Sequence, residues 1–248
     1  MYKSIEEITL NTWPAEQSVV MNGWILRTAS GYTKRANSVN PLYEAEESYA
    51  DTLERIKLAE QYYEDAGLQP VFKITPFIQP ANLDDILADR GYAIVQPSSV
   101  RLLDLEQLTV PESGYSIQIQ DKLSIEWLDA FTELDELSQE KRNILTRMLS
   151  ASHLQQGYAL LLEKGIPISC GLGVIQQGYI GIYDIVTAPL YRRQGKAKQL
   201  LLELLLWGRS QGASSSFLQV VQNNHGASAL YDQLGYKEIY QYWYRVQS

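Results

Sequence analysis

The chain has 248 residues, a formal net charge of −8 at pH 7, 45% hydrophobic residues and 20% charged residues, which is typical of a folded globular protein. No apolar run approaches the ~20 residues of a membrane helix, and the N-terminal stretch lacks the apolar core of a signal peptide. An acidic chain also has the wrong overall field for binding nucleic acid. We therefore expect a cytoplasmic protein with neither membrane nor nucleic-acid partners.

The first half predicts two strands within residues 22–43, joined by a turn near Ser30-Gly31 and followed by an acidic helix. A strand, a short helix and a strand then extend to about residue 104. The second half predicts one strand, two helices, three strands, a helix, a strand, a helix and a final strand. The first strand covers residues 114–120, the two helices cover 124–137 and 141–151, and the three strands lie within 158–188. The next helix covers about 195–211, followed by a strand at 214–222, a helix at 225–235 and the final strand at 236–246.

The two halves end in similar patterns. The pair Gly91-Tyr92 recurs 144 residues later as Gly235-Tyr236, and Arg101 and Arg245 keep the same offset. Matching helix and strand patterns at a fixed offset favour an internal duplication. We therefore predict two domains, residues 1–110 and 111–248, divided near residues 106–114, where proline, serine and glycine interrupt the pattern.

A metal site is not expected. The only cysteine, Cys170, excludes an intrachain disulfide and lies in a stretch typical of a buried strand. His153 and His225 have no metal-ligand spacing to Cys170 or to each other.

The segment YRRQGKAKQLLLELLLWG places three cations around Gly195 and continues as a helix with one apolar face. The helix N-terminus carries free N–H groups and the positive end of the dipole, which suits a phosphate. The alternative is a solvated basic first turn, but cations there cost roughly 0.3–1 kcal/mol each. The pattern therefore indicates a bound anion. The spacings of a nucleotide P-loop and of a dinucleotide fingerprint are both absent.

The stretch TAPLYRRQGKA resembles the acetyl-CoA loop of the GNAT acyltransferase superfamily, with Arg192, Gly195 and Ala197 at its signature positions. The segment LQVVQNNHGASALYDQLGY resembles the strand and helix that follow in that family. The resemblance covers roughly residues 111–248. It implies an α+β fold in which a mixed, mostly antiparallel twisted sheet is flanked by helices, and an acyl-CoA-dependent N-acyltransferase that uses acetyl-CoA without a metal.

The same resemblance implies a role for each matching residue. The backbone of the strand end would run beside the pantetheine arm, the amides of the turn would hold the diphosphate with an arginine nearby, an asparagine would bond the pantetheine and a tyrosine would protonate the leaving thiolate. The strand end is Ile185, Val186 and Thr187, and the amides of the turn belong to Arg193, Gln194, Gly195, Lys196 and Ala197. The arginine is Arg192, the asparagine is Asn224 and the tyrosine is Tyr231. The alternatives are a helix N-cap for Asn224 and core packing for Tyr231.

The general base is left open. An alkylamine with a pKa near ~10.4 must lose a proton before it attacks. Asp184 is the only carboxylate in the strand GYIGIYDIVT, and strand alternation would place it on the face opposite Tyr183 and Ile185. A chain of water molecules is the alternative base.

The N-terminal half has no glycine-centred cationic turn, so we expect one acetyl-CoA site per chain and a degenerate GNAT-like domain that shapes the acceptor pocket. Arg27, Arg35 and Asn37 are the candidate acceptor-binding residues, because polar side chains on apolar strands need partners. The alternative is a structural hydrogen-bond network.

The acceptor and the assembly stay open. We expect a small-molecule amine or a peptide amine; a hydroxyl group and a protein N-terminus are alternatives. The chain could act as a monomer or a homodimer. The competing function is a non-catalytic acyl-CoA-binding sensor or scaffold.

Overall fold

The computed structural model describes residues 2–44, 49–108 and 117–247. The chain forms two compact units, and unit 1 consists of two segments that are separated in the sequence by unit 2. Unit 1 is Met1–Ser99 with Tyr240–Ser248, and unit 2 is Val100–Ile239. Two long strands, β5 (Tyr92–Asp104) and β11 (Lys237–Gln247), therefore each contribute residues to both units. The expected boundary segment lies largely outside the described residues, so the division at residues 110 and 111 stays a prediction.

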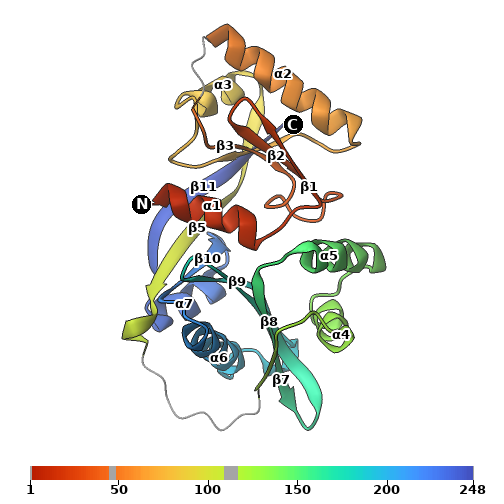
Figure 1. Ribbon diagram of the computed structural model, residues 1–248, viewed down its shortest axis with the longest axis vertical. Helices are drawn as coiled ribbons and strands as arrows, with labels where there is room; N and C mark the ends of the chain where they lie inside the picture. Colours follow the sequence, from red (N-terminus) through yellow and green to blue (C-terminus); the bar gives the residue numbers. More distant parts are fainter. Residues whose placement is uncertain (1, 45–48, 109–116, 248) are drawn as a thin grey trace. The chain divides into compact units, whose positions relative to one another are not determined.

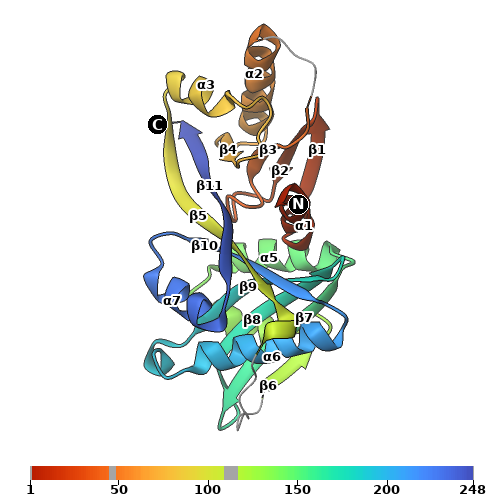
Figure 2. The ribbon, with the colours of Figure 1, turned by 90° about the vertical axis from the view of Figure 1, so that its left-hand side faces the viewer.

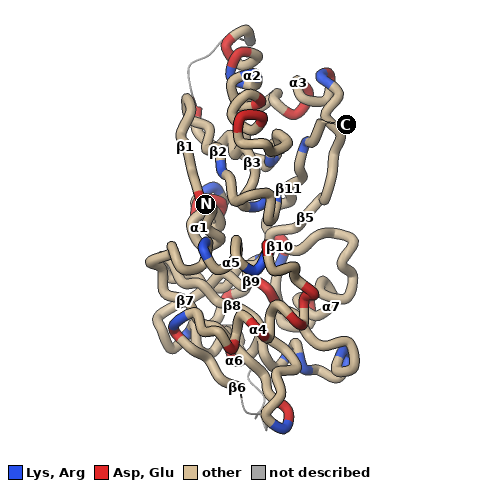
Figure 3. The backbone as a smooth tube through the Cα atoms, turned by 90° about the vertical axis from the view of Figure 1, so that its right-hand side faces the viewer, with Lys and Arg blue, Asp and Glu red and all other residues tan. Residues whose placement is uncertain are grey.

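Unit 1 is built on a sheet with the order β1-β2-β3-β4-β11, in which only the β3–β4 pair is parallel (Figure 1). Its elements are α1 (Tyr2–Thr12), β1 (Gln17–Met21), β2 (Trp24–Thr28), β3 (Ser38–Pro41), α2 (Tyr49–Asp65), β4 (Val71–Ile74) and α3 (Leu83–Asp89). Helix α2 carries several acidic positions, which are red in Figure 3. The described first turn of α2 carries the acidic Asp51, whose charge would repel a diphosphate.

The interior of unit 1 combines an apolar core with one buried ion pair. Trp24 and Phe72 are fully buried and meet edge to face at 6.0 Å. On the other face of β4, Lys73 pairs with the fully buried carboxylate of Glu6, which also accepts a 2.6 Å hydrogen bond from the Tyr240 hydroxyl. A buried charge pair with a further hydrogen bond satisfies the groups that burial would otherwise leave unpaired.

Unit 2 is built on a sheet with the order β5-β10-β9-β8-β7-β6, in which β9 and β10 form a parallel pair and β6 to β9 are antiparallel. Its elements after β5 are η1 (Leu105–Gln107), β6 (Ile117–Gln120), α4 (Ile125–Leu134), α5 (Gln139–Ala151), β7 (Gln155–Glu163), β8 (Ile166–Gln176), β9 (Tyr179–Thr187), η2 (Pro189–Tyr191), α6 (Lys196–Ser210), β10 (Ser215–Val221) and α7 (His225–Leu234).

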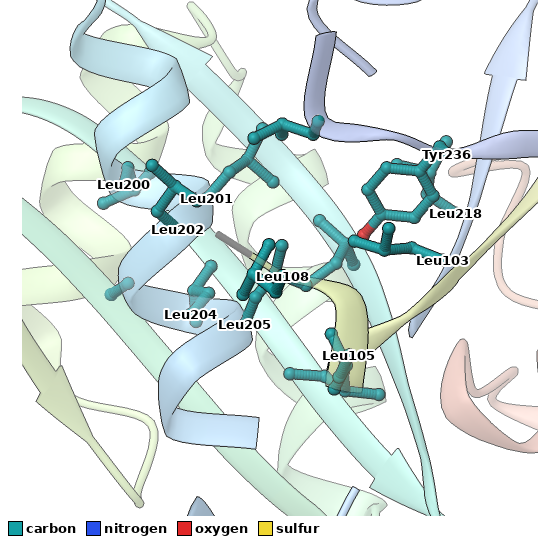
Figure 4. Close-up of a cluster of buried hydrophobic side chains, with 14 of the residues drawn as sticks. Leu103, Leu105, Leu108, Leu200, Leu201, Leu202, Leu204, Leu205, Leu218 and Tyr236 are labelled. Carbon is teal, nitrogen blue, oxygen red and sulfur yellow. The ribbon is translucent and has the colours of Figure 1, made fainter. Parts of the chain in front are cut away.

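Helices α6 and α4 pack on opposite faces of this sheet. Gly157 faces α6, and a Cβ atom there would lie only 2.6 Å from the Trp207 ring, so glycine allows the close approach. The next residue, Tyr158, points the other way and meets Trp127 of α4 at 5.2 Å. Helix α6 crosses one face of the sheet (Figure 2). Its leucines pack with residues of β5, η1 and β10 in a single core cluster (Figure 4), which anchors the helix and fixes where its N-terminus lies.

The expected fold class is confirmed: a mixed, mostly antiparallel sheet flanked by helices. Within the second half, the predicted order of elements matches the structure. In the first half, α1 and β1 were not predicted, and the expected second strand of residues 22–43 is the short β3, which starts only at Ser38. Asn37 makes hydrogen bonds within the polar segment between β2 and β3, as described below.

Candidate active site

A cavity of about 550 Å³ opens in unit 2 where β9, the turn after it, α6 and α7 meet. Eight of the residues predicted to serve the site line it: Ile185, Thr187, Arg192, Arg193, Gly195, Lys196, Ala197 and Tyr231. The lining also includes residues that the motif did not predict, among them Lys198 and Gln233. Lys198 comes directly after Ala197, the last position of the signature. The basic composition of the turn is the signal that could have indicated it. The structure thus brings the cationic turn and the tyrosine of α7 to one cavity.

The turn that precedes α6 has two residues in the left-handed region. Arg193 has φ +58° and Gly195, the N-cap residue, has φ +77°. No side chain among the described residues caps this helix end, and a Cβ atom on Gly195 would meet nothing within 4 Å. The first N–H groups of a helix have no intrahelical acceptor, and successive amides around left-handed residues form a concave anion-binding surface. This backbone geometry suits a phosphate or diphosphate.

Two side chains of the turn brace it from within. The Arg192 Nε atom donates to the Thr187 carbonyl at 3.0 Å, which ties the turn to the end of β9. The Gln194 side chain donates to the Leu190 carbonyl at 2.8 Å. Gln194 is not among the cavity-lining residues, so a role in ligand binding falls to its backbone amide alone and stays a prediction.

Lys196 is held by the protein itself. Its side chain is buried, and its Nζ atom lies 3.5 Å from Glu163 Oε1 at the end of β7. The hydroxyl of Tyr191 donates a hydrogen bond to the same carboxylate, and this bond raises the pKa of Tyr191. Glu163 therefore offsets the charge of Lys196, and the exposed cations of the turn are Arg192 and Arg193.

Strand β9 is irregular where the motif residues begin. Its register against β8 shifts between Tyr183, opposite Leu172, and Val186, opposite Cys170, and Asp184 has φ +52°. The expected strict alternation of side chains is therefore interrupted at Asp184 by a β-bulge. The bulge lies opposite the buried segment around Cys170 on β8, and burial, followed by the charges of Asp184 and Asp135, raises the pKa of the Cys170 thiol. A role for Asp184 as general base stays a prediction.

The parallel pairing of β9 with β10 ends early. It runs from Tyr179 opposite Ser215 to Ile182 opposite Leu218, and the strands separate beyond it although β9 continues to Thr187. Ile185 and Thr187 then line the cavity, while the Val186 carbonyl accepts a 2.7 Å hydrogen bond from Ser169 on β8. A ligand in the cavity can thus run along the backbone of the separated strand end.

Helix α7 supplies the opposite wall. Asn224 is its N-cap, with Oδ1 accepting from the Ala227 amide at 3.1 Å, and it does not line the cavity. The capping alternative is therefore what the structure shows for this side chain, and pantetheine binding by it stays a prediction. Tyr231 is half-buried, meets Tyr236 at 5.9 Å and lines the cavity, so the core and the ligand site share this residue.

The three candidate acceptor-binding residues lie in unit 1. The buried Arg27 donates to the carbonyls of Leu10, Trp13 and Arg35. Asn37 Oδ1 accepts from the amides of Ala29 and Gly31 at 2.7 and 2.9 Å. The Arg35 guanidinium lies 5.8 Å from the Trp13 ring. For Arg27 and Asn37 these contacts fit the alternative, a structural hydrogen-bond network. Acceptor binding by the three residues stays a prediction.

Two kinds of feature are missing from residues 2–44, 49–108 and 117–247. No group of three or more histidine, cysteine, aspartate or glutamate side chains there could hold a metal ion. Within the same ranges, every helix is too short or too polar to span a bilayer.

Comparison with known proteins identifies the family. Residues 2–245 match the family model described as "Probable histone acetyltransferase Rv0428c C-terminal". An uncharacterized N-acetyltransferase, YobR of Bacillus subtilis (strain 168), is 29% identical over 99% of this chain and 98% of its own length. A probable histone acetyltransferase, Rv0428c of Mycobacterium tuberculosis, is 22% identical over 95% of this chain and 70% of its own length.

Solved structures show the same fold. A GCN5-related N-acetyltransferase from Kribbella flavida aligns with a TM-score of 0.73 at 15% identity, over 99% of this chain and 94% of its own. A tandem GNAT protein from the clavulanic acid biosynthesis pathway aligns with a TM-score of 0.65 at 13% identity, over 89% and 77% of the two chains. The chain belongs to the Rv0428c C-terminal acetyltransferase family, within the GNAT superfamily of N-acetyltransferases.

Proposed function

We propose that the chain transfers an acetyl group from acetyl-CoA to an amine by direct attack, with the donor bound in the cavity of unit 2. The observation that carries this proposal is the turn at Gly195. Its left-handed residues and the uncapped start of α6 face a cavity that also contains Tyr231. An anion site and a proton donor on one cavity are what acyl transfer from an acyl-CoA requires.

The donor is accommodated by three parts of unit 2. The amides of Arg193 to Ala197 bind the diphosphate, and Arg192 and Arg193 add charge. The backbone from Ile185 to Thr187 runs beside the pantetheine arm where β9 has left β10. An N–H group near Ile185, next to the bulge, donates to the oxygen of the reacting carbonyl.

Tyr231 donates the proton that the sulfur of the departing CoA needs. A tyrosine with an ordinary pKa near ~10 is protonated at neutral pH and can serve as an acid. Asp184, directly or through water, removes the proton of the attacking amine. The acceptor is a small-molecule amine or a peptide amine; the similarity to the mycobacterial probable histone acetyltransferase favours the peptide amine.

Calorimetry combined with a thiol-release assay tests the proposal. We expect one acetyl-CoA per chain, and thiol release that depends on one member of a panel of small amines and lysine peptides. S-acetylpantetheine, which lacks the diphosphate, is the matched ligand and should bind far more weakly. Tight binding of acetyl-CoA with no amine-dependent thiol release would instead indicate an acyl-CoA sensor. Equal affinity for the two ligands would rule out the diphosphate site.

A further inference from the structure

An arginine of β5 holds the helix that carries Tyr231. The Arg101 side chain is mostly buried, and its Nη1 atom donates to Asp232 Oδ1 at 2.7 Å and to the Ser228 carbonyl at 3.3 Å. Ser228 and Asp232 lie one turn apart on α7, so a single guanidinium spans that turn. Tyr231 is the neighbour of Asp232 and lies in the same turn.

A matched contact exists in unit 1. Arg245, which follows Arg101 by 144 residues, binds both carboxylate oxygens of Asp84 on α3, through Nε at 2.7 Å and Nη2 at 3.0 Å. Its Nη1 atom donates to the Tyr92 carbonyl at 2.9 Å. Helix α3 contributes no residue to the cavity of unit 2. A similar arginine–aspartate pair thus holds α7, which lines the cavity, and α3, which does not.

Apolar packing and Arg101 together hold the middle of α7. The helix has ten residues, Leu234 at its C-terminal end is buried, and Asn224 caps its start. Helices this short are marginal without tertiary contacts. Ala227, Leu230 and Tyr231 pack against the core cluster of unit 2 but are only partly buried, and the same face borders the cavity. The contacts of Arg101 therefore add a polar anchor to the turn with Tyr231, beside this partial apolar packing.

We propose that Arg101 is a positioning residue that fixes α7 and sets the distance of the Tyr231 hydroxyl from the reacting sulfur. This inference rests on the proposed function. The Asp232 side chain is 65% exposed, so the ion pair alone contributes little to global stability. Misplacement of a catalytic group is costly by comparison, up to about a hundredfold in rate for a displacement of about 1 Å. Loss of Arg101 should therefore affect turnover more than folding.

The test compares the full-length variants Arg101→Gln, Arg101→Lys, Asp232→Asn and Arg245→Gln. We expect Arg101→Gln to lower kcat about tenfold while the Kd for acetyl-CoA changes less than threefold. Arg101→Lys, which can keep one contact to Asp232, should recover most of the loss. Asp232→Asn, at an exposed position where folding is not at risk, should lower kcat to a lesser extent. Arg245→Gln removes the more buried of the two ion pairs, so it should lower the thermal midpoint at least as much as Arg101→Gln does and leave kcat unchanged.

Amide hydrogen exchange separates this inference from the proposed function. In Arg101→Gln, amides of residues 228–235 should exchange faster; in Arg245→Gln, those of residues 83–89 should. If wild-type protein turns over but Arg101→Gln loses no more kcat than Arg245→Gln, or exchange in α7 does not change, the positioning role is overturned. If wild-type protein releases no thiol with any amine, the proposed function falls, and with it the catalytic role of Arg101, whatever exchange shows for α7.

Discussion

The ammonium of Lys196 lies 3.5 Å from the carboxylate of Glu163, so one of the three cations around Gly195 already has an anionic partner within the protein. Arg193, three residues before Lys196, is exposed and lines the cavity. We expect Lys196→Met to change the Kd for acetyl-CoA less than threefold and Arg193→Met to raise it about tenfold, as the loss of a charge-assisted hydrogen bond predicts. Calorimetry measures both, and the reverse order would show that Lys196 contacts the diphosphate.

Gly195 permits a backbone conformation that side chains disfavour. Alanine at φ +77° costs about 1–2 kcal/mol, and its Cβ atom would stand between the amides and the ligand. We expect Gly195→Ala to weaken acetyl-CoA binding about tenfold and to have little effect on S-acetylpantetheine.

Gly212 provides the control for that substitution. It has φ +93°, has equally open space around its Cβ position and does not line the cavity. Gly212→Ala should therefore lower the thermal midpoint by a similar amount without changing acetyl-CoA affinity. Equal losses of affinity in the two variants would mean that the effect at Gly195 comes from global destabilisation.

Tyr231→Phe keeps the ring contact with Tyr236 and removes only the hydroxyl. We expect kcat to fall about 10²-fold or more, because general acid catalysis contributes at least that much, with acetyl-CoA affinity nearly unchanged. Steady-state kinetics and calorimetry on the same preparation provide the two numbers. An unchanged kcat, or equal losses of kcat and affinity, would remove Tyr231 from the acid role.

The pH dependence of stability has a defined contributor in unit 1. Burial tends to raise the pKa of Asp84, but hydrogen bonds from Arg245 and Trp243 outweigh it and hold that pKa below its ordinary value. A depressed native pKa stabilises the fold above the unfolded value of about 3.9, and this stabilisation is lost as the pH falls through the native pKa. Asp84→Asn should therefore be destabilised relative to wild type at pH 7, with the difference shrinking below about pH 4.

Urea unfolding of both proteins at several pH values between 3 and 7 measures this effect. The urea midpoints of wild type and Asp84→Asn should converge as the pH falls. A difference in midpoint that stays constant over the range would show that the charge of Asp84 contributes nothing.

Much of the second half could be predicted from local patterns. Glycine-containing turns divide β7, β8 and β9, and the leucine periodicity of α6 reflects burial that the structure shows. The position of Gly195 at the helix start followed from the same periodicity. The bulge at Asp184 could not be predicted, because strand alternation assumes a regular ladder and the interruption depends on pairing with β8.

The groups that individual side chains contact could not be predicted from the sequence either. Arg27 and Asn37 are residue types common in ligand sites, but their hydrogen-bond partners are backbone groups of neighbouring segments of unit 1. Glu163 belongs to no recognisable sequence motif, although its carboxylate, at the end of β7, pairs with the ammonium of Lys196 on α6. Such partnerships depend on tertiary contacts and have no local signature.

The division of β5 and β11 between the two compact units determines how the chain can be truncated. A fragment ending at residue 110 would lack Tyr240–Ser248, a part of unit 1 that includes Arg245. A fragment beginning at residue 111 would lack Arg101 and Leu105, which belong to unit 2. Neither half would be a minimal catalytic module; expression trials should retain the whole polypeptide or supply both pieces together.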